Sequence, residues 1–369
     1  IKGNFKPESI NEQCKMVLFD GQGLGHKTTA TSLSNETINY FKMSDAVILV
    51  DNAQAPMLEN VKMALKATIE YGFAKKMVIA YTHVDLMNGA NLTNFQDKKN
   101  HILIALDSYL SDLKKNNSYI FSEIEATAIQ NATFFFSGLD KKDTSKMTKH
   151  YMDCLINHLK QLLTTSITPS DVQLTYNAMT LIKHLKCSLA SYRQNWGEII
   201  GYPYKCLNTE HWTRIKALSR RLAYFNQDHY NYELMPLADL RQTIAMELNI
   251  FLNMPLDIVP EESSEEVRVA LISEIKNALN NKIADFITEK MWKNTEQSKR
   301  WTEAYNFTGK DSTYFRAAKI NEIFEFGAPR IAQFAYDMTD IQKRYVMNMI
   351  DLVESTLNEY NANLEKFEL

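Results

Sequence analysis

The first residues able to do chemistry lie near the start of the chain. A short apolar run, 16–19, ends in Asp20 and is followed by the segment GQGLGH, residues 21–26. An aspartate at the carboxyl end of a buried strand can bind Mg²⁺ through water. A glycine three residues later lets its amide reach a terminal phosphate, because no side chain obstructs the approach. Asp20 is therefore a candidate metal-binding residue, and Gly23 is a candidate phosphate-binding residue.

A second group follows the apolar run 77–81, which leads into Thr82-His83-Val84-Asp85. Ligands of α/β proteins bind at the carboxyl edge of the sheet, where such a segment would lie. The two carboxylate oxygens of Asp85 can accept hydrogen bonds from N1 and N2 of guanine, a pattern that adenine cannot offer. Thr82, His83 and Asp85 are therefore candidates for binding a base, with His83 stacked beside it.

A third group follows the apolar run 133–136, which ends in Ser137-Gly138-Leu139. A backbone amide at Ser137 or Gly138 can donate a hydrogen bond to guanine O6. All three groups come directly after strand-sized runs, so the elements that position them can be read from the surrounding pattern.

Short apolar runs alternate with helical patterns through residues 16–81, in the order βαβαβ. The runs are continuous, which is typical of parallel strands buried on both faces by helices. The sequence therefore predicts an α/β domain with a mostly parallel sheet over residues 1–165. Parallel strands would bring the three groups to one edge.

The second half, residues 166–369, is predicted to be an all-helical domain, because strand signals vanish and amphipathic segments take over. Ser263 or Ser264 is the expected N-cap of a helix that ends near Lys290. An apolar stripe over 346–367 predicts one long helix. This helix packs within the bundle or forms a coiled coil with another chain, and the bundle is favoured.

Asp20–His26, Thr82–Asp85 and Ser137–Leu139 together resemble the third, fourth and fifth motifs of P-loop GTPases. The form of the first two is similar to that of large GTPases of the dynamin and guanylate-binding-protein type. The resemblance implies an incomplete G-domain-like α/β fold followed by a helical domain. It further implies GTP as ligand, Mg²⁺ as cofactor, and GTP hydrolysis coupled to assembly or partner binding through the helical domain.

Two departures from the family pattern bear on nucleotide binding. THVD replaces the usual NKxD, which weakens the expected preference for guanine. The family places a phosphate loop, GxxxxGK[ST], upstream of DxxG, and the nineteen residues before Asp20 contain none. Because the first residue is Ile1 rather than methionine, we expect that an upstream segment was removed; otherwise the fold is a G-like scaffold that no longer binds. A later match, 304–311, follows a helical pattern and is predicted to be a helix end and a turn.

Catalytic residues are harder to assign. Leu24 occupies the position at which small GTPases place the glutamine that orients the attacking water. Gln22 and His26 are the nearby candidates for positioning water, although His26 can instead cap the helix that follows. The chain has no arginine before Arg193, so an arginine finger would come from upstream, from the helical half or from a second protomer.

Other clusters favour structural roles. The basic helix expected over 211–221 is interpreted as a bundle helix whose charges meet acidic neighbours, with a phosphate-contacting surface as the alternative. His150 and His158 would be about 12 Å apart on one helix, too far to share a zinc ion. A helix surface with a buried thiol at Cys154 is the favoured interpretation.

Composition limits the class of protein. With 369 residues, 45% hydrophobic residues and a net charge of -3, the chain is typical of a globular protein and the charge argues against a nucleic-acid partner. No apolar run approaches the roughly 18–20 residues of a transmembrane helix. Four cysteines without CxxC pairing, and no signal-peptide pattern, predict a cytoplasmic location.

A competing hypothesis is a non-enzymatic module. In this view the G-like fold is a scaffold, and the helical half binds a protein partner or a second copy of the chain. Such a module would belong to a multicomponent system such as bacterial phage defence, with the Lys- and Asn-rich composition favouring a bacterial source.

Overall fold

The computed structural model describes residues 37, 40, 41, 43–116, 123–139, 141, 145–164, 172–224, 234–261 and 263–366. The predicted strand 16–20 and the motif 20–26 lie outside these residues. The first half contains the strands β1 (Val47–Asn52), β2 (Met77–Thr82) and β3 (Thr133–Phe135), and the helices α2 (Glu59–Glu70), α3 (Phe95–Asn116), α4 (Glu123–Asn131) and α5 (Lys146–Thr164).

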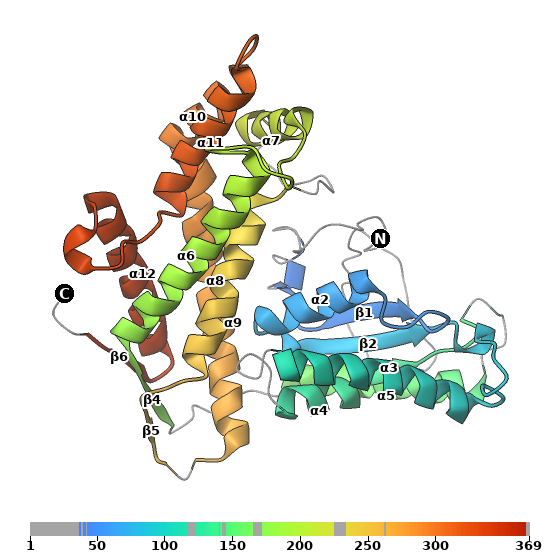
Figure 1. The fold of residues 1–369 in the computed structure, drawn as a ribbon. Coiled ribbons are helices and arrows are strands. Elements are labelled where there is room, and N and C mark those ends of the chain that lie inside the picture. Colours follow the sequence, from blue (N-terminus) through green and yellow to red (C-terminus); the bar gives the residue numbers. More distant parts are fainter. Residues whose placement is uncertain are drawn as a thin grey trace.

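The three strands of the first half form a parallel sheet in the order β1-β2-β3. Val47 pairs with Met77, and Ile79 pairs with Thr133. Helices connect successive strands, as parallel pairing requires. The prediction of a parallel α/β arrangement is confirmed for this part of the chain (Figure 1).

The two faces of this sheet are covered unequally. Leu49, Ile79 and Phe135 pack on one face in a core that includes residues of α2, α3 and α4. On the other face, side chains of β2 and β3 pack against α5. Among the described residues, the core on this face includes none from β1, and Val50 of β1 is 60% exposed. The expectation that every strand is buried on both faces is therefore wrong for β1, whose burial alternates along the strand.

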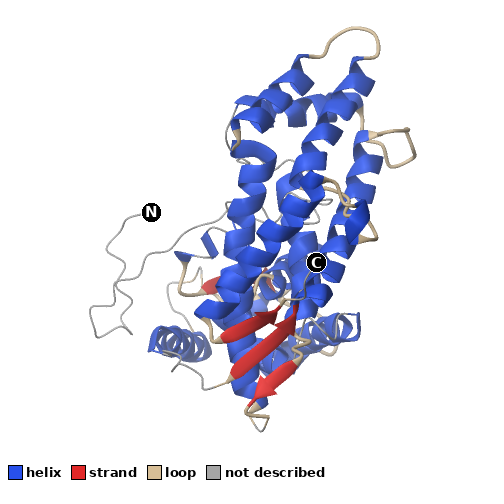
Figure 2. Ribbon diagram, turned by 90° about the vertical axis from the view of Figure 1, so that its left-hand side faces the viewer, coloured by secondary structure: helices blue, strands red, loops and turns tan. Residues whose placement is uncertain are grey.

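The second half is mainly helical, with long helices that pack along one another (Figure 1). Its helices are α6 (Ala178–Ile200), α7 (Trp212–Tyr224), α8 (Pro236–Leu252), α9 (Glu265–Thr288), α10 (Thr295–Asn306), α11 (Ser312–Gly327) and α12 (Asp340–Glu359). The expected all-helical domain is not entirely helical. Three short strands, β4 (Gln173–Asn177), β5 (Asp257–Val259) and β6 (Ala362–Glu365), form a mixed sheet in the order β5-β4-β6. They lie at one end of the long helices (Figure 2).

Local sequence explains where several helices begin and end. Helix α9 begins after Ser264, whose hydroxyl accepts a hydrogen bond from Val267 N, so the predicted N-cap is confirmed. Helix α10 ends at Asn306 and α11 begins at Ser312, which confirms the predicted helix end and turn over 304–311.

Helix α12 ends earlier than the apolar stripe predicted. It stops at Glu359, and Asn361 adopts a left-handed backbone conformation with φ of 54°. Leu364 then belongs to β6, where it pairs with Tyr176 of β4. Residues of the stripe within α12, such as Val353 and Leu357, are fully buried in the core of the second half. The helix therefore packs within the bundle, as favoured above.

The basic helix is α7, and its charges are largely accounted for. Arg214 pairs with Glu210 at 2.7 Å, and Arg221 is buried and donates to the carbonyl of Leu234 at 2.7 Å. The interpretation as a bundle helix whose charges meet acidic neighbours is confirmed for Arg214, whereas Arg221 packs in the bundle and donates to a backbone carbonyl.

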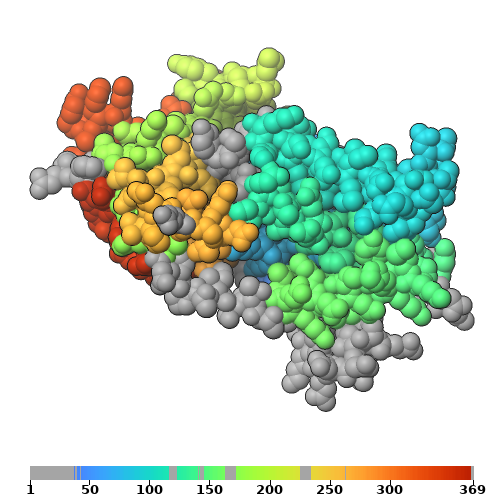
Figure 3. All heavy atoms as spheres, turned by 90° about the horizontal axis from the view of Figure 1, so that it is seen from below, coloured from blue at the N-terminus to red at the C-terminus, as the bar shows by residue number. Residues whose placement is uncertain are grey.

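The C-terminal end of α2 joins the two halves through buried polar contacts. The backbone carbonyl of Glu70 accepts a hydrogen bond from Asn249 of α8 at 2.7 Å. The side-chain carboxylate of Glu70 accepts one from Gln242 of α8 at 3.1 Å. Ser273 of α9 donates to the carbonyl of Gly72 at 3.3 Å. Ala245 of α8 belongs to the core of the first half. In Figure 3 the orange atoms of the α9 region adjoin the teal atoms of the first half.

Candidate functional site

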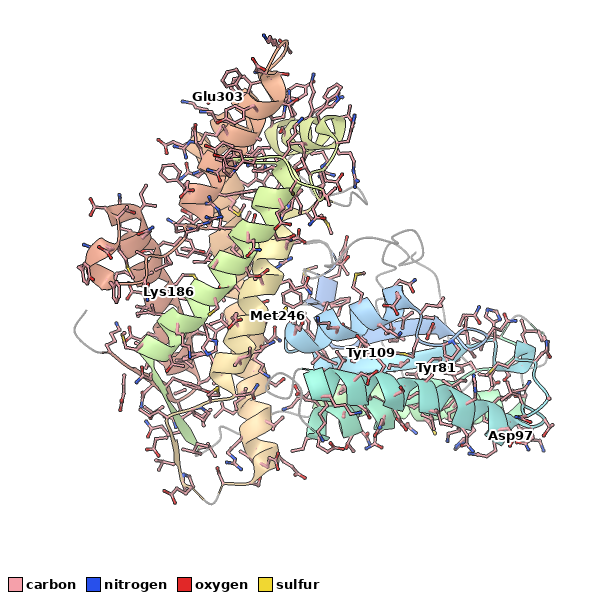
Figure 4. All side chains as sticks on the ribbon, in the orientation of Figure 1. Tyr81, Asp97, Tyr109, Lys186, Met246 and Glu303 are labelled. Carbon is pink, nitrogen blue, oxygen red and sulfur yellow. The ribbon has the colours of Figure 1, made fainter. Side chains whose placement is uncertain are left out.

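The candidate site lies at the carboxyl edge of the sheet β1-β2-β3. In Figure 1 the arrows of β1 and β2 point away from the helical bundle, so this edge lies far from the bundle. Asp97, near the start of α3, marks the same end of the first half in Figure 4. Parallel pairing brings the segments that follow β2 and β3 to this edge, as the sequence predicted.

Asp85 and Gly138 meet at this edge. The amide of Gly138 donates to Asp85 Oδ1 at 3.0 Å, and Lys141 Nζ donates to Asp85 Oδ2 at 2.8 Å. The hydrogen bond from Lys141 is the main reason that the pKa of Asp85 is lowered from its ordinary value. Asp85 is therefore an ionised acceptor at neutral pH, and the structure brings together the two predicted base-binding turns.

Backbone contacts hold the two turns in place. The amide of Val84 donates to the carbonyl of Phe136 at 3.1 Å, and the amide of Phe136 donates to the carbonyl of Tyr81 at 2.8 Å. The buried Thr148 of α5 donates its hydroxyl to the carbonyl of Ser137 at 2.8 Å and accepts from the Ser137 amide at 3.2 Å. The turn at 137–138 is thus fixed from both the sheet and α5.

His83 connects β2 to the short 3₁₀ turn Val84–Leu86. Its backbone is left-handed, with φ of 61° and ψ of 30°, and its side chain is exposed. The exposed ring lies two residues from Asp85, where it is free of the sheet's packing. Thr82 faces the other way along the edge, because its hydroxyl donates to the carbonyl of Asp51 at 3.2 Å. Thr82 therefore supports the loop after β1 rather than Asp85.

Asp51 is a carboxylate at the same edge that sequence reasoning did not select. It is buried near the end of β1 and accepts hydrogen bonds from the amides of Asn52 at 2.8 Å and Met57 at 2.9 Å. Burial raises its pKa above the ordinary value, and the two backbone hydrogen bonds partly offset that rise. Its signal was available, since Asp51 ends the apolar run 46–50 in the sequence just as Asp20 ends the run 16–19. Its carboxylate orders the turn that precedes α2.

The remaining predicted site residues lie outside the described part of the chain. These are Asp20, the proposed metal ligand, Gly23, and the two catalytic candidates Gln22 and His26. Within the described ranges, no group of three or more His, Cys, Asp or Glu side chains could hold a metal ion. Cys154 Sγ lies 3.6 Å from His150 Nε2 on α5, which agrees with a helix-surface contact.

No protein-family model, curated protein or solved structure matches this chain. No helix in the described part of the chain is long and apolar enough to cross a membrane.

The site contains the ionised carboxylate of Asp85, with the Gly138 amide and the Lys141 ammonium group each within hydrogen-bonding distance of it. This set can accept two hydrogen bonds from a planar donor edge and donate one to a nearby carbonyl. Lys141 carried no signal in the sequence, because it meets Asp85 only when the loop after β3 folds back.

Proposed function

We propose that the chain binds GTP, with its guanine base read at the carboxyl edge by Asp85 and the turn at 137–138. The observation that carries this proposal is the 3.0 Å contact between the Gly138 amide and Asp85 Oδ1. It joins a TxxD turn and an SGL turn, far apart in sequence, at one edge of a parallel sheet. In P-loop GTPases, which these motifs resemble, the corresponding turns bind the base.

Recognition would use the groups already present. Asp85 would accept hydrogen bonds from N1 and N2 of guanine, and a backbone amide of Ser137 or Gly138 would donate to O6. The lowered pKa of Asp85 keeps it ionised, as an acceptor must be. His83 would stack beside the base from its exposed position. Lys141 and the Gly138 amide would have to release the two oxygens of Asp85, and a Ser137 amide that donated to O6 would have to leave Thr148. Base binding therefore competes with these contacts.

Hydrolysis of GTP is the second part of the proposal. Asp20 would hold Mg²⁺, which neutralises phosphate charge when it is bound, and Gly23 would contact the terminal phosphate. Gln22 and His26 would position the attacking water. Base recognition by Asp85 does not depend on these residues, so it can be tested separately. The helical half would then couple the nucleotide state to assembly or to a protein partner.

Replacing Asp85 by asparagine tests the assignment of the base site. Asparagine offers one acceptor and one donor, which matches xanthine better than guanine. In titrations with fluorescent GTP, ATP and XTP analogues and Mg²⁺, Asp85→Asn should weaken GTP binding about tenfold or more and strengthen XTP binding. The titration is repeated with whatever coding sequence precedes Ile1, because the family places its phosphate loop there.

The matched control is Asp97→Asn, which removes a carboxylate at the same edge that accepts from Thr93 instead. This control should leave both affinities unchanged. An unaltered preference in Asp85→Asn would show that Asp85 does not read the base.

One observation favours a second candidate function, a G-like scaffold that binds no nucleotide. Both oxygens of Asp85 already have partners within the chain, the Gly138 amide and Lys141. Such a closed turn would serve as structure and leave the helical half to bind another protein. The same titrations separate the candidates, since a scaffold would bind none of the three nucleotides in either form.

A further inference from the structure

The loop 201–211, between α6 and α7, is fixed by hydrogen bonds within itself and to the end of α6. The amide of Cys206 donates to Thr209 Oγ1 at 2.8 Å, and the amide of Glu210 donates to the carbonyl of Ile199 at 2.9 Å. Asn208 Nδ2 donates to Glu198 Oε2 at 2.8 Å. Gly201 has φ of 67°, and a Cβ there would lie 2.7 Å from Thr209 Cγ2, so the turn requires glycine.

This ordered loop places large apolar side chains in solvent. Leu207 is fully exposed and Tyr204 is 84% exposed. Beside the loop, at the start of α11, Tyr314 and Phe315 are each about half exposed. Contact between the rings of Tyr202 and Tyr314, with centroids 5.8 Å apart, joins the loop to α11. We call Tyr204, Leu207, Tyr314 and Phe315 the tip patch.

The tip patch lies at the end of the bundle opposite the sheet β5-β4-β6. Figure 1 shows the connection between α10 and α11 at this extremity, with α7 beside it. Glu303, near the end of α10, marks the same region in Figure 4. The patch is therefore on a different part of the molecule from Asp85 and plays no part in the proposed base site.

Basic residues predominate around the tip patch. The two segments that form this end of the bundle, 201–224 and 302–319, contain eight basic and three acidic residues, although the whole chain has a net charge of -3. Glu210 pairs with Arg214 and Glu303 pairs with Lys319, so these four charges offset one another. Of the other six basic residues, Arg221 and Arg316 are buried, and the remaining acidic residue, Asp311, is exposed. Lys205 and Lys310 are exposed beside the apolar side chains. The partner of this surface should therefore be both apolar and anionic.

We infer that the tip patch binds the surface of an anionic lipid bilayer. Tyrosine, leucine and phenylalanine next to lysine is the composition that enters a bilayer interface, with rings at the headgroups and cations at the lipid phosphates. The loop is already ordered, so binding does not have to fix its backbone. A second copy of the chain fits less well, because a symmetric contact would bring the two basic tips together.

Vesicle flotation of the full chain tests this inference. Vesicles of phosphatidylcholine alone are compared with vesicles that also contain phosphatidylserine, at low and at raised salt. The chain should bind the anionic vesicles and lose binding as salt rises, because salt screens the lysines. Leu207→Glu should weaken binding about tenfold or more, because it removes an exposed leucine that would enter the bilayer and adds a negative charge. Lys205→Glu should weaken it about fivefold or more.

Leu256→Glu is the matched control. Leu256 is 57% exposed and lies just before β5, at the other end of the bundle, so its replacement should leave vesicle binding unchanged. Circular dichroism of all variants checks that they remain folded, which their exposed positions lead us to expect. Absence of binding to anionic vesicles, or equal binding by Leu207→Glu, would overturn the inference. The inference would also be overturned if the chain did not bind vesicles but self-associated with rising concentration, and Leu207→Glu abolished this self-association. That result would assign the tip patch to a second copy of the chain.

Discussion

His83 is the residue of the candidate site whose backbone conformation is least favourable. A left-handed conformation costs a residue other than glycine about 1–2 kcal/mol, and His83 adopts it with φ of 61°. We therefore expect His83→Gly to be about 1 kcal/mol more stable than His83→Ala, measured as the free energy of unfolding in urea. At an ordinary helical position, by contrast, the alanine variant is more stable than the glycine variant.

The control for that comparison is Ala217, an exposed residue in the middle of α7. Here Ala217→Gly should lower the free energy of unfolding by about 1 kcal/mol. If His83→Ala proved as stable as His83→Gly, the turn after β2 would not be left-handed in solution.

Strand ends were enough to predict which turns meet at the candidate site. Asp85 and Gly138 each follow a buried apolar run, and parallel pairing of the strands brings both turns to one edge, as predicted. The hydrogen bond between the Gly138 amide and Asp85 was not predicted. The ion pair of Lys141 with Asp85 could not be predicted. The two residues are 56 positions apart in sequence, and they meet only because of the path taken by the loop after β3. Thr82 was assigned to the base, whereas its hydroxyl bonds to the carbonyl of Asp51.

At the scale of elements, α2 connects the edge that carries the site to the helical half. Its first turn follows the Asp51 loop, and its last residue, Glu70, contacts α8. Glu70 is almost wholly buried, and burial raises the pKa of its carboxyl above the ordinary value of 4.5, although Lys66 lies 3.6 Å away and opposes the shift. The folded protein therefore disfavours the ionised form of Glu70.

This raised pKa predicts a pH dependence of stability. The folded state binds the Glu70 proton more tightly than the unfolded state, so stability falls as pH rises from about 4.5 through the raised pKa. Glu70→Gln removes this titration and keeps an oxygen that can accept from Gln242. Relative to the wild type, the free energy of unfolding of Glu70→Gln should therefore increase as pH rises from 4.5 to neutrality. Urea unfolding at several pH values measures the difference.

Glu59→Gln is the control, since Glu59 lies at the other end of α2 with a side chain that is 90% exposed. Its stability relative to the wild type should vary little over the same pH range. If the difference in free energy of unfolding between Glu70→Gln and the wild type also stayed constant with pH, Glu70 would not be buried against α8.

Elements with a strong local signal were predicted, and elements that depend on distant pairing were not. Helix α9 has its own cap and acidic first turn, so its start could be read from sequence. The strands of the second sheet are only three to five residues long, and β4 pairs with residues near the end of the chain, as in Leu174 with Ala362. Leu364 is buried in β6, but its spacing from the apolar residues of α12 also fits a helical stripe. The sequence pattern therefore predicted helix where the structure has β6.

At the scale of the whole molecule, the two halves have separate cores joined by a mainly polar contact. Among the described residues, the core of the second half is formed by side chains between Val172 and Leu364. In the part of the chain that the structure describes, the core of the first half takes one residue, Ala245, from the bundle. Around Ala245, the bundle meets the first half with polar side chains, Gln242, Asn249 and Ser273, which water can satisfy if the first half is removed.

We therefore expect residues 166–369, expressed alone, to fold into a stable helical unit. Far-ultraviolet circular dichroism should show high helix content, and thermal unfolding should show one cooperative transition, because the apolar core remains complete. Residues 1–165 expressed alone provide the comparison, since they lose the cover that Ala245 and α8 give to α2. A fragment 166–369 that melted without cooperativity would show that the buried contacts of Glu70 are needed to organise the bundle, and that the two halves fold as one unit.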